Sequence, residues 1–412
     1  MKPLLVSASD LDGGAARAAY RLHHGLLLKG VQSRLLVRDK LGIDINTVKH
    51  KTLASKLAAN LDAAPTHFYS RRVCSMFTPQ WFPDTIAPSI QELAPDIINL
   101  HWIGLGYIQI ETLAKFKQPI VWTLHDMWAF TGGCHYIYNC DHYTVSCGNC
   151  PQLQSHTDWD LSRLVWQRKK NAWKNLNLTI VTPSRWLAKC ASASSLFRNT
   201  PIEVIPNGID PVIYRPINYQ IARNLLNFPL DKKLVLFGSA SATSDPRKGF
   251  QFLQAALKIL RQSDLQSQIV LVVFGASASS SNEDLGFQCY YLNKLNDDIA
   301  LALAYASADV FIAPSVQDNL PNTIMEALAC GTPCVTFDIG GMPDMIEHQK
   351  NGYLAKPFEI EDLAQGIKWI LQQGSNQYQI LRKNARQKVE REFTQEMQAK
   401  KYQSLFQKIL KK

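Results

Sequence analysis

Short apolar runs alternate with amphipathic stretches along most of the chain. In the first half, apolar runs at 4–8, 33–37, 97–100, 120–124 and 179–182 predict buried strands, and stretches at 15–29, 108–116 and 161–175 predict helices. The second half repeats the scheme, with strands at 234–237, 269–274, 310–313 and 334–337 and helices at 249–260, 297–305 and 323–330. Strands that alternate with helices are typical of doubly wound parallel sheets, so the pattern predicts an α/β fold.

A break rich in Pro, Asn and Gly divides the two halves at 204–210, in the sequence Val-Ile-Pro-Asn-Gly-Ile-Asp. The break predicts two Rossmann-like domains, residues 1–211 and 212–392, followed by a last helix within 393–412. Open sheets of this class bind ligands at the carboxyl ends of their strands. Candidate site residues are therefore sought directly after each predicted strand.

The segment 315–331, SVQDNLPNTIMEALACG, follows such a strand and opens a helix. Asn322 is expected to cap that helix, and its first backbone N–H groups and positive dipole end suit a phosphate. Two carboxylates flank the helix start, Asp318 before it and Glu326 one turn inside it. Carboxylates at these places can accept protons from the hydroxyl groups of a sugar and a ribose.

Two adjacent cations, Arg247 and Lys248, lie at another predicted helix entrance, where Gly249 follows them. Cations at a helix entrance oppose the helix dipole, so a bound anion accounts for them better than solvent does. A diphosphate that leaves with its negative charge is the expected anion. The alternative is a solvated basic helix start.

In the first half, Gly13 and Gly14 follow the first strand and permit close approach of a ligand to the backbone, while Arg17 lies one turn into the helix. The loop is not a Gly-x-Gly-x-x-Gly, so a nicotinamide site is poorly supported. His125 and Asp126 end another strand and are expected at the same sheet edge. Asp126 would orient the His125 ring or bind an acceptor hydroxyl; the alternative for His125 is a satisfied core histidine.

The 315–331 segment resembles the Glu-x7-Glu segment of the retaining family 4 glycosyltransferases, through its Leu-Pro, its Glu-Ala-Leu-Ala-Cys-Gly and the Gly-Thr-Pro that follows. The resemblance implies a GT-B fold, in which two Rossmann-like domains face each other across a cleft and the last helix crosses back to the first domain. The sequence departs from the family at two places. Asp318 stands where the family has Glu, and no Arg follows Gly238.

The same resemblance implies roles for the candidate residues. A nucleotide-sugar donor is expected mainly on the second domain, with Glu326 on the ribose and Asp318 on the transferred sugar. His125 is expected on the donor sugar and near the acceptor, with Asp126 and Arg17 on the acceptor side. The donor-binding set implied in this way is Gly14, Arg247, Lys248, Asn319, Leu320, Thr323 and Glu326, and the catalytic set is His125, Asp318 and Lys248.

Four of the nine cysteines, Cys134, Cys140, Cys147 and Cys150, fall within the segment 132–151. Thiolates with one Cys-x2-Cys spacing suit a tetrahedral structural zinc, which leaves no open position for catalysis. The alternative is four reduced cysteines in a compact loop. Similar Gly-Gly-Cys-His-Tyr loops occur in glycosyltransferases of bacterial polysaccharide assembly, which favours that subclass. The triplets at 10–12 and 158–160 resemble metal-binding Asp-x-Asp motifs by chance, so no catalytic metal is expected.

The formal net charge of +10 is concentrated in the first half, where residues 1–210 hold 22 basic against 15 acidic side chains. The helix at 161–175 mixes Trp166 and Trp173 with cations, which suits an anionic membrane surface if the tryptophans face outward and a plain solvated face if they pack inward. No recognition motif favours nucleic acid. No apolar run reaches the length of a transmembrane helix, and the first residues predict a strand rather than a signal peptide, so a cytoplasmic protein, peripheral at the inner membrane face, is expected.

These features and the family resemblance together predict a glycosyltransferase of the hexosyl type that moves a sugar from a UDP- or GDP-sugar to a saccharide or lipid-linked acceptor. Retention of configuration is implied by the resemblance alone. Two alternatives stay open at this stage. One is a catalytically inactive GT-B subunit used for binding, favoured by Asp318 and the missing Arg. The other is a nucleotide-sugar epimerase on the same fold.

Overall fold

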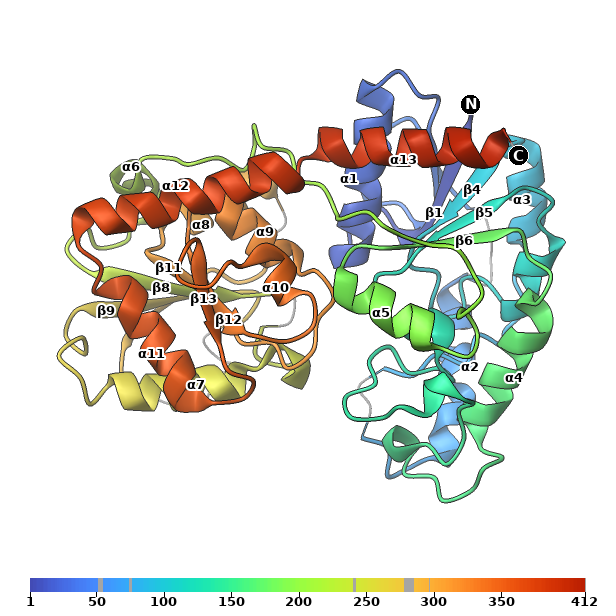
Figure 1. The fold of residues 1–412 in the computed structure, drawn as a ribbon, viewed down its shortest axis with the longest axis horizontal. Coiled ribbons are helices and arrows are strands. Elements are labelled where there is room, and N and C mark those ends of the chain that lie inside the picture. Colours follow the sequence, from blue (N-terminus) through green and yellow to red (C-terminus); the bar gives the residue numbers. More distant parts are fainter. Residues whose placement is uncertain (51–54, 74–75, 240–241, 278–284, 296, 412) are drawn as a thin grey trace. The chain divides into compact units, whose positions relative to one another are not determined.

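Two parallel sheets organise the computed structural model, one in each of two units (Figure 1). The structure describes residues 1–50, 55–73, 76–239, 242–277, 285–295 and 297–411. Unit 1 comprises Met1–Pro206 together with Glu396–Lys412, and unit 2 comprises Asn207–Gln395. The chain thus passes from unit 1 to unit 2 within the Pro/Asn/Gly break and returns to unit 1 with its last helix.

The sheet of unit 1 has seven strands in the order β3-β2-β1-β4-β5-β6-β7, all of them parallel. Its strands are β1 (Pro3–Ser9), β2 (Arg34–Asp39), β3 (Thr47–Lys49), β4 (Ile97–Leu100), β5 (Ile120–Thr123), β6 (Leu178–Thr182) and β7 (Ile202–Val204). Its α-helices are α1 (Gly14–Leu28), α2 (Ser55–Ala63), α3 (Ile86–Leu93), α4 (Leu161–Trp173), α5 (Arg185–Ala193) and α13 (Gln395–Leu410). The order doubles back at β1, which makes β1 and β4 the switch point beside which such sheets bind ligands.

Each face of the unit 1 sheet carries its own apolar core. On one face, Leu5 and Val121 pack with Tyr402 and Phe406 of α13, so the returning helix covers part of this sheet. On the other face, Trp122 packs with Trp173 of α4, whose rings meet edge to face at 5.1 Å. Strands buried on both faces are expected to be almost continuously apolar, which is why they stand out in the sequence.

The sheet of unit 2 has six parallel strands in the order β10-β9-β8-β11-β12-β13. Its strands are β8 (Lys233–Gly238), β9 (Ile269–Phe274), β10 (Gln288–Tyr291), β11 (Val310–Ala313), β12 (Cys334–Phe337) and β13 (Gly352–Ala355). Its α-helices are α6 (Tyr219–Leu226), α7 (Phe250–Leu260), α8 (Asp298–Ser307), α9 (Asn322–Ala329), α10 (Met342–Met345), α11 (Ile360–Leu371) and α12 (Ser375–Glu392). The switch point of this sheet lies at β8 and β11.

Two local expectations were wrong. The stretch at 108–116 forms a single 3-10 helix, Ile110–Lys115, because Phe116 turns into an extended conformation directly after it. Asn322 is the first residue of α9 rather than its cap, since Pro321 occupies the cap position with its fixed backbone angle.

Candidate functional site

The carboxyl end of the unit 2 sheet gathers two cations around one carboxylate. Lys248 Nζ lies 2.6 Å from Asp318 Oδ2, and Arg247 Nη1 lies 3.0 Å from the same oxygen. The cations come from the single-turn 3-10 helix η6 (Pro246–Lys248), which follows β8 in the chain, and the carboxylate comes from the loop after β11. The structure thus brings together three of the predicted site residues across 70 positions of sequence.

Asp318 is an ionised group in this arrangement. Burial opposes the charge, but Lys248 and Arg247 outweigh burial and hold the pKa of Asp318 well below its usual range. The backbone of Asp318 is fixed from the other side, because Gly341 N–H donates to its carbonyl at 3.1 Å and Gly340 packs against that carbonyl with a φ of +55°. The carboxylate therefore has little freedom to follow a ligand.

The two cations are placed by close backbone packing. Gly249 ends η6 with a φ of +75°, and a Cβ there would stand 1.8 Å from the carbonyl oxygen of Pro314. The Asp245 side chain accepts from the backbone N–H of Arg247 at 3.0 Å and pairs with its guanidinium at 3.1 Å. Only glycine fits between η6 and the end of β11, which gives the Lys-Gly pair of the sequence a physical reason.

Helix α9 presents the second carboxylate. Glu326 is buried, and its Oε2 accepts a hydrogen bond from the hydroxyl of Tyr305 in α8 at 3.0 Å. Before the helix, Asn319 and Leu320 are buried, and the backbone N–H of Asn319 donates to Asp318 Oδ1 at 3.0 Å. Thr323 lies in the first turn of α9.

In unit 1, the loop after β1 carries Gly13 in a left-handed conformation, with a φ of +90°, and Gly14 begins α1. Gly13 is therefore the residue whose backbone needs glycine. Arg17 is half-buried in the first turn of the helix. The two carboxylate oxygens of Asp10 accept from the backbone N–H groups of Leu41 and Gly42, both at 2.9 Å. Asp10 therefore fixes the loop after β2.

His125 follows β5 and is half-buried, and its partner is another histidine. His125 Nε2 lies 2.9 Å from Nδ1 of His101, which follows the neighbouring strand β4, and the two rings stack at 5.2 Å. Burial lowers the pKa of His125 to about 4. A neutral imidazole is therefore expected at neutral pH.

The expectation that Asp126 orients the His125 ring is not what the hydrogen bonds show. The Asp126 carboxylate accepts from His135 Nδ1 at 2.7 Å, from Trp102 Nε1 at 2.9 Å and from the backbone N–H of Trp128 at 2.9 Å. These partners hold its pKa below the usual value in spite of burial. A small cavity beside this network is lined by both histidines of the 101–125 pair, by Trp102 and by Asp126.

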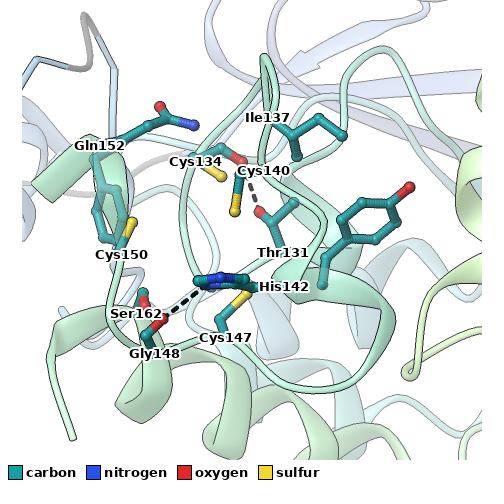
Figure 2. Close-up of a pocket in the computed structure, with 13 residues that line it drawn as sticks. Thr131, Cys134, Ile137, Cys140, His142, Cys147, Gly148, Cys150, Gln152 and Ser162 are labelled. Atoms are coloured by element: carbon teal, nitrogen blue, oxygen red, sulfur yellow. Dashed lines mark hydrogen bonds between the residues drawn. The ribbon is translucent and has the colours of Figure 1, made fainter. Parts of the chain in front are cut away.

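The four cysteines of the segment 132–151 surround one pocket (Figure 2), which Cys134, Cys140, Cys147, Cys150 and His142 line. Three of the four are buried, and burial raises the pKa of Cys147 to about 12. Figure 2 shows the sulfurs around the pocket rather than meeting at one point. Among the described residues, no three His, Cys, Asp or Glu side chains converge closely enough to hold a metal ion as they stand.

A buried lysine contacts Thr131, one of the residues that line this pocket. Lys169 of α4 is 0% exposed, donates to the carbonyl oxygens of Trp128 and Thr131, and lies 3.6 Å above the Trp128 ring. Burial lowers its pKa to about 7, while Cys147 and Cys134 act in the opposite direction. A buried cation whose partners are two carbonyl oxygens and an aromatic ring calls for a nearby negative charge.

The same helix settles two other expectations. Trp166 and Trp173 are both buried, so α4 does not present an aromatic face to a membrane. Asp160 caps α4 by accepting from the backbone N–H of Arg163 at 3.0 Å, so the triplet at 158–160 serves the helix. In the described part of the chain, no helix is long and apolar enough to cross a membrane.

Several residues in these networks were missed in the sequence. His101 directly follows an apolar strand, just as His125 does, so the strand-end rule could have found it. Asn99 lies in β4, and its side-chain oxygen is 3.1 Å from His101 Nε2. Asn99, Tyr305 and Lys169 lie within strands or helices, and nothing in their local pattern marks them. Their partners are distant in the chain, and only the fold brings them together.

Comparison with known proteins agrees with this arrangement. The family model described as Glycosyltransferase Family 4 matches residues 12–212, and the model described as Glycosyl transferases group 1 matches residues 220–388. The chain is 26% identical over 354 residues to the sulfoquinovosyl transferase SQD2 of Arabidopsis thaliana, covering 80% of this chain and 62% of SQD2. It is 22% identical over 379 residues to WcaC of Escherichia coli, a putative colanic acid biosynthesis glycosyl transferase, covering 86% and 87% of the two chains.

Two further comparisons concern the share of a relative that the chain covers and the similarity of the fold to a solved structure. The chain is 30% identical over 210 residues to the uncharacterized glycosyltransferase MJ1607 of Methanocaldococcus jannaschii, and the match covers 47% of this chain and only about half, 50%, of that relative. Among solved structures, Anabaena Alr3699/HepE in complex with UDP and glucose matches with a TM-score of 0.64 at 16% identity, covering 99% of each chain. At this identity the structural match establishes the GT-B fold. Since the two family models between them span both units, the chain belongs to the family 4 glycosyltransferases.

Proposed function

We propose that the protein transfers a sugar from a nucleotide-sugar donor to a saccharide or lipid-linked acceptor, with the retention of configuration that characterises its family. The observation that carries the proposal is the pair of cations, Lys248 and Arg247, gathered around one buried carboxylate at the carboxyl end of the unit 2 sheet. Asp318 and Asp245 both pair with these cations. A diphosphate carries more negative charge than one carboxylate and would compete with them for Lys248 and Arg247.

In this proposal, Lys248 and Arg247 neutralise the diphosphate as it leaves, together with the backbone N–H groups between Asn319 and Thr323. Asp318 accepts a hydrogen bond from a hydroxyl group of the transferred sugar. Glu326 accepts a hydrogen bond from the ribose, and Tyr305 orients the Glu326 carboxylate. Gly14, at the start of α1, remains a proposed donor-binding residue. No residue is assigned as a covalent nucleophile.

Thermal unfolding with UDP, GDP, ADP and CMP tests the donor site. A ligand at about 100 times its dissociation constant adds about 2.7 kcal/mol to the free energy of unfolding. We expect one diphosphate to raise the melting temperature of the wild type and of Lys258→Ala, and not that of Lys248→Ala. Lys258 is an exposed cation of the same unit on α7, so its removal controls for charge alone. A shift that survives Lys248→Ala would place the nucleotide elsewhere.

The match to WcaC supports an acceptor from polysaccharide assembly, with His125, Asp126 and Arg17 on the acceptor side. The Asp126 carboxylate already accepts hydrogen bonds from His135 and Trp102. We therefore expect His125 and Arg17 to make the acceptor contacts. Transfer of radiolabelled sugar to lipid extracts, compared with conversion of the nucleotide-sugar to its epimer, distinguishes a transferase from an epimerase, and an inactive subunit gives neither product. An anionic membrane as partner now rests only on the basic excess of residues 1–210 and is tested by sedimentation with anionic and neutral vesicles.

For the four-cysteine pocket we propose a structural zinc. His142 Nδ1 lies 3.0 Å from the carbonyl oxygen of Gly148 (Figure 2), and a carbonyl oxygen can only accept. Nδ1 therefore carries the proton, and in a neutral ring the lone pair is at Nε2. Backbone N–H groups support the thiolates: those of Leu153 and Gln152 favour the charged form of Cys150, although burial raises its pKa to about 11. Lys169 supplies a counter-charge. The sulfurs would have to close on the ion from their present places around the pocket.

Metal analysis of protein purified without chelators tests the zinc. About one zinc per chain in the wild type, and loss of zinc in Cys147→Ser, are expected. Cys190→Ser is the control, because Cys190 lies outside the segment. Protein without zinc, whose four thiols react freely with a thiol reagent in zinc-supplemented buffer, would favour the reduced-cysteine alternative.

A further inference from the structure

A continuous set of hydrogen bonds leads from the core of unit 1 to His125. Tyr402 of α13 lies 2.8 Å from the hydroxyl of Thr123, which accepts from Asn99 Nδ2 at 3.0 Å. Asn99 Oδ1 lies 3.1 Å from His101 Nε2, and His101 Nδ1 lies 2.9 Å from His125 Nε2. Tyr402, Asn99 and His101 are all buried.

The orientation of the Asn99 amide is fixed by a group that can only accept. The carbonyl oxygen of Val121, on the neighbouring strand, lies 3.0 Å from Asn99 Nδ2. The opposite orientation would bring two carbonyl oxygens together in a buried site, which would leave both without a donor. The nitrogen of the amide must therefore face Val121, and its oxygen must face His101.

The proton positions on the two rings follow from this orientation. Asn99 Oδ1 accepts, so His101 Nε2 carries the proton. His101 is only 2% exposed, and such burial disfavours a second proton on the ring, so its Nδ1 is a lone pair and accepts a hydrogen bond from His125 Nε2–H. His125 then carries its proton on Nε2, and its Nδ1 is a lone pair.

We propose that Asn99 and His101 are positioning residues that hold His125 in a single tautomer, with the proton on Nε2 and Nδ1 as an acceptor. Whatever meets Nδ1 must then be a donor, such as a sugar hydroxyl or a backbone N–H, and not a phosphate oxygen. The lowered pKa of His125 agrees with a ring that stays neutral. The inferred tautomer itself is independent of the donor chemistry. Only its use toward a sugar hydroxyl rests on the proposed function.

Nitrogen NMR of protein labelled with ¹⁵N-histidine tests the tautomer without any substrate. The chain has ten histidines, and the signals of His125 are assigned by their loss in His125→Gln. In the wild type we expect a protonated Nε2 and an unprotonated Nδ1. The reverse pattern overturns the proposal.

Asn99→Asp is the sharpest variant, because it keeps the shape of the side chain. A carboxylate beside His101 stabilises its doubly protonated ring, so His101 Nδ1–H would donate to His125. The two His125 nitrogens should then exchange their signals, with the proton on Nδ1. An unchanged His125 tautomer in a folded Asn99→Asp protein whose introduced carboxyl group is ionised, as its ¹³C carboxyl shift reports, overturns the proposal.

His101→Phe is a second variant for the case that Asn99→Asp does not fold. It removes the acceptor for His125 Nε2–H, so a mixture of both tautomers is expected. A single Nε2–H tautomer in His101→Phe would show that His101 does not set it. Two controls should leave His125 as in the wild type. Tyr402→Phe keeps the Val121 contact that orients Asn99, and His23→Gln removes another buried histidine, whose partners are Ser33 and Asp44.

A steady-state comparison separates this proposal from the proposed function. If the protein transfers sugar, His101→Phe should lower kcat/KM while nucleotide diphosphate binding stays as in the wild type. If no transfer is found with any donor, the NMR result still decides the tautomer.

Discussion

One oxygen of Asp318 is shared by Lys248 Nζ at 2.6 Å and Arg247 Nη1 at 3.0 Å. This carboxylate stands where family 4 enzymes have the longer Glu. It pairs with both cations that would face a departing diphosphate. Asp318 is thus at once the partner of the cations and the group expected on the sugar.

Replacing Asp318 by Asn should destabilise unit 2. The two cations would lose their shared anion, and because both are partly exposed the expected loss is about 1–3 kcal/mol rather than the larger figure for a fully buried pair. Urea unfolding of the variant measures it. A saturating diphosphate should restore more stability to Asp318→Asn than to the wild type. An equal gain in both proteins would mean that the anion does not meet these cations.

The lowered pKa of Asp318 also predicts how the free energy of unfolding changes at acid pH. The pKa of Asp318 is lower in the folded chain than in the unfolded chain, where it is about 3.9. Its contribution is therefore fully present above about pH 4 and is lost as the pH falls through the folded value. Between pH 5 and pH 3, the free energy of unfolding should fall less steeply in Asp318→Asn than in the wild type. Parallel curves for the two proteins would contradict the shift.

Glu326 and Tyr305 should affect nucleotide binding to different degrees. A hydrogen bond to a charged group contributes about 1.5–3 kcal/mol, so Glu326→Gln should weaken nucleotide diphosphate binding by about tenfold to a hundredfold. Tyr305→Phe leaves the carboxylate and removes only its orienting donor, so a smaller loss is expected. Titration calorimetry compares the two variants, with a 2′,3′-dideoxy nucleotide as the matched ligand. If Glu326→Gln weakens both nucleotides equally, Glu326 does not contact the ribose.

Lys169→Met tests whether the buried cation serves a metal centre. With zinc thiolates beside it, the loss of Lys169 should lower zinc content and speed loss of zinc to a chelator. Without a metal, Lys169→Met loses only the hydrogen bonds to the Trp128 and Thr131 carbonyl oxygens, so its melting temperature should fall by the same amount with and without EDTA. Melting temperatures with and without EDTA separate the two cases. Lys170→Met is the control, since Lys170 is the exposed neighbour on the same helix.

Gly249→Ala should damage the placement of Lys248. The added Cβ would meet the Pro314 carbonyl oxygen at 1.8 Å, and a φ of +75° is strained for alanine, so a loss of at least about 2 kcal/mol is expected. Gly374→Ala is the matched control, because nothing lies within 4 Å of a Cβ there. Similar melting temperatures for both variants would show that the loop after β11 can move away.

The sequence was informative where chemistry follows the order of the chain. The strands β4, β9, β11 and β12 and the helix α13 were predicted with their observed bounds or nearly so, because buried parallel strands are continuously apolar. The family was recognised from one segment, and its membership is confirmed. What could not be predicted are pairings across the sheet. The contact of Asp318 with two cations, and the partnership of Asp126 with His135 instead of His125, depend on side-chain directions that no local pattern encodes.

The helix that carries Tyr402 completes unit 1 but is the last part of the chain to be synthesised. Unit 1 needs α13 to cover Leu5 and Val121 of its sheet, and α13 is translated only after all of unit 2. A nascent chain that ends at the unit boundary therefore exposes an apolar sheet face and lacks the last partner of Thr123. Unit 1 must wait for the second unit to leave the ribosome before it can finish folding, so we expect its early chain to depend on chaperones more than that of unit 2.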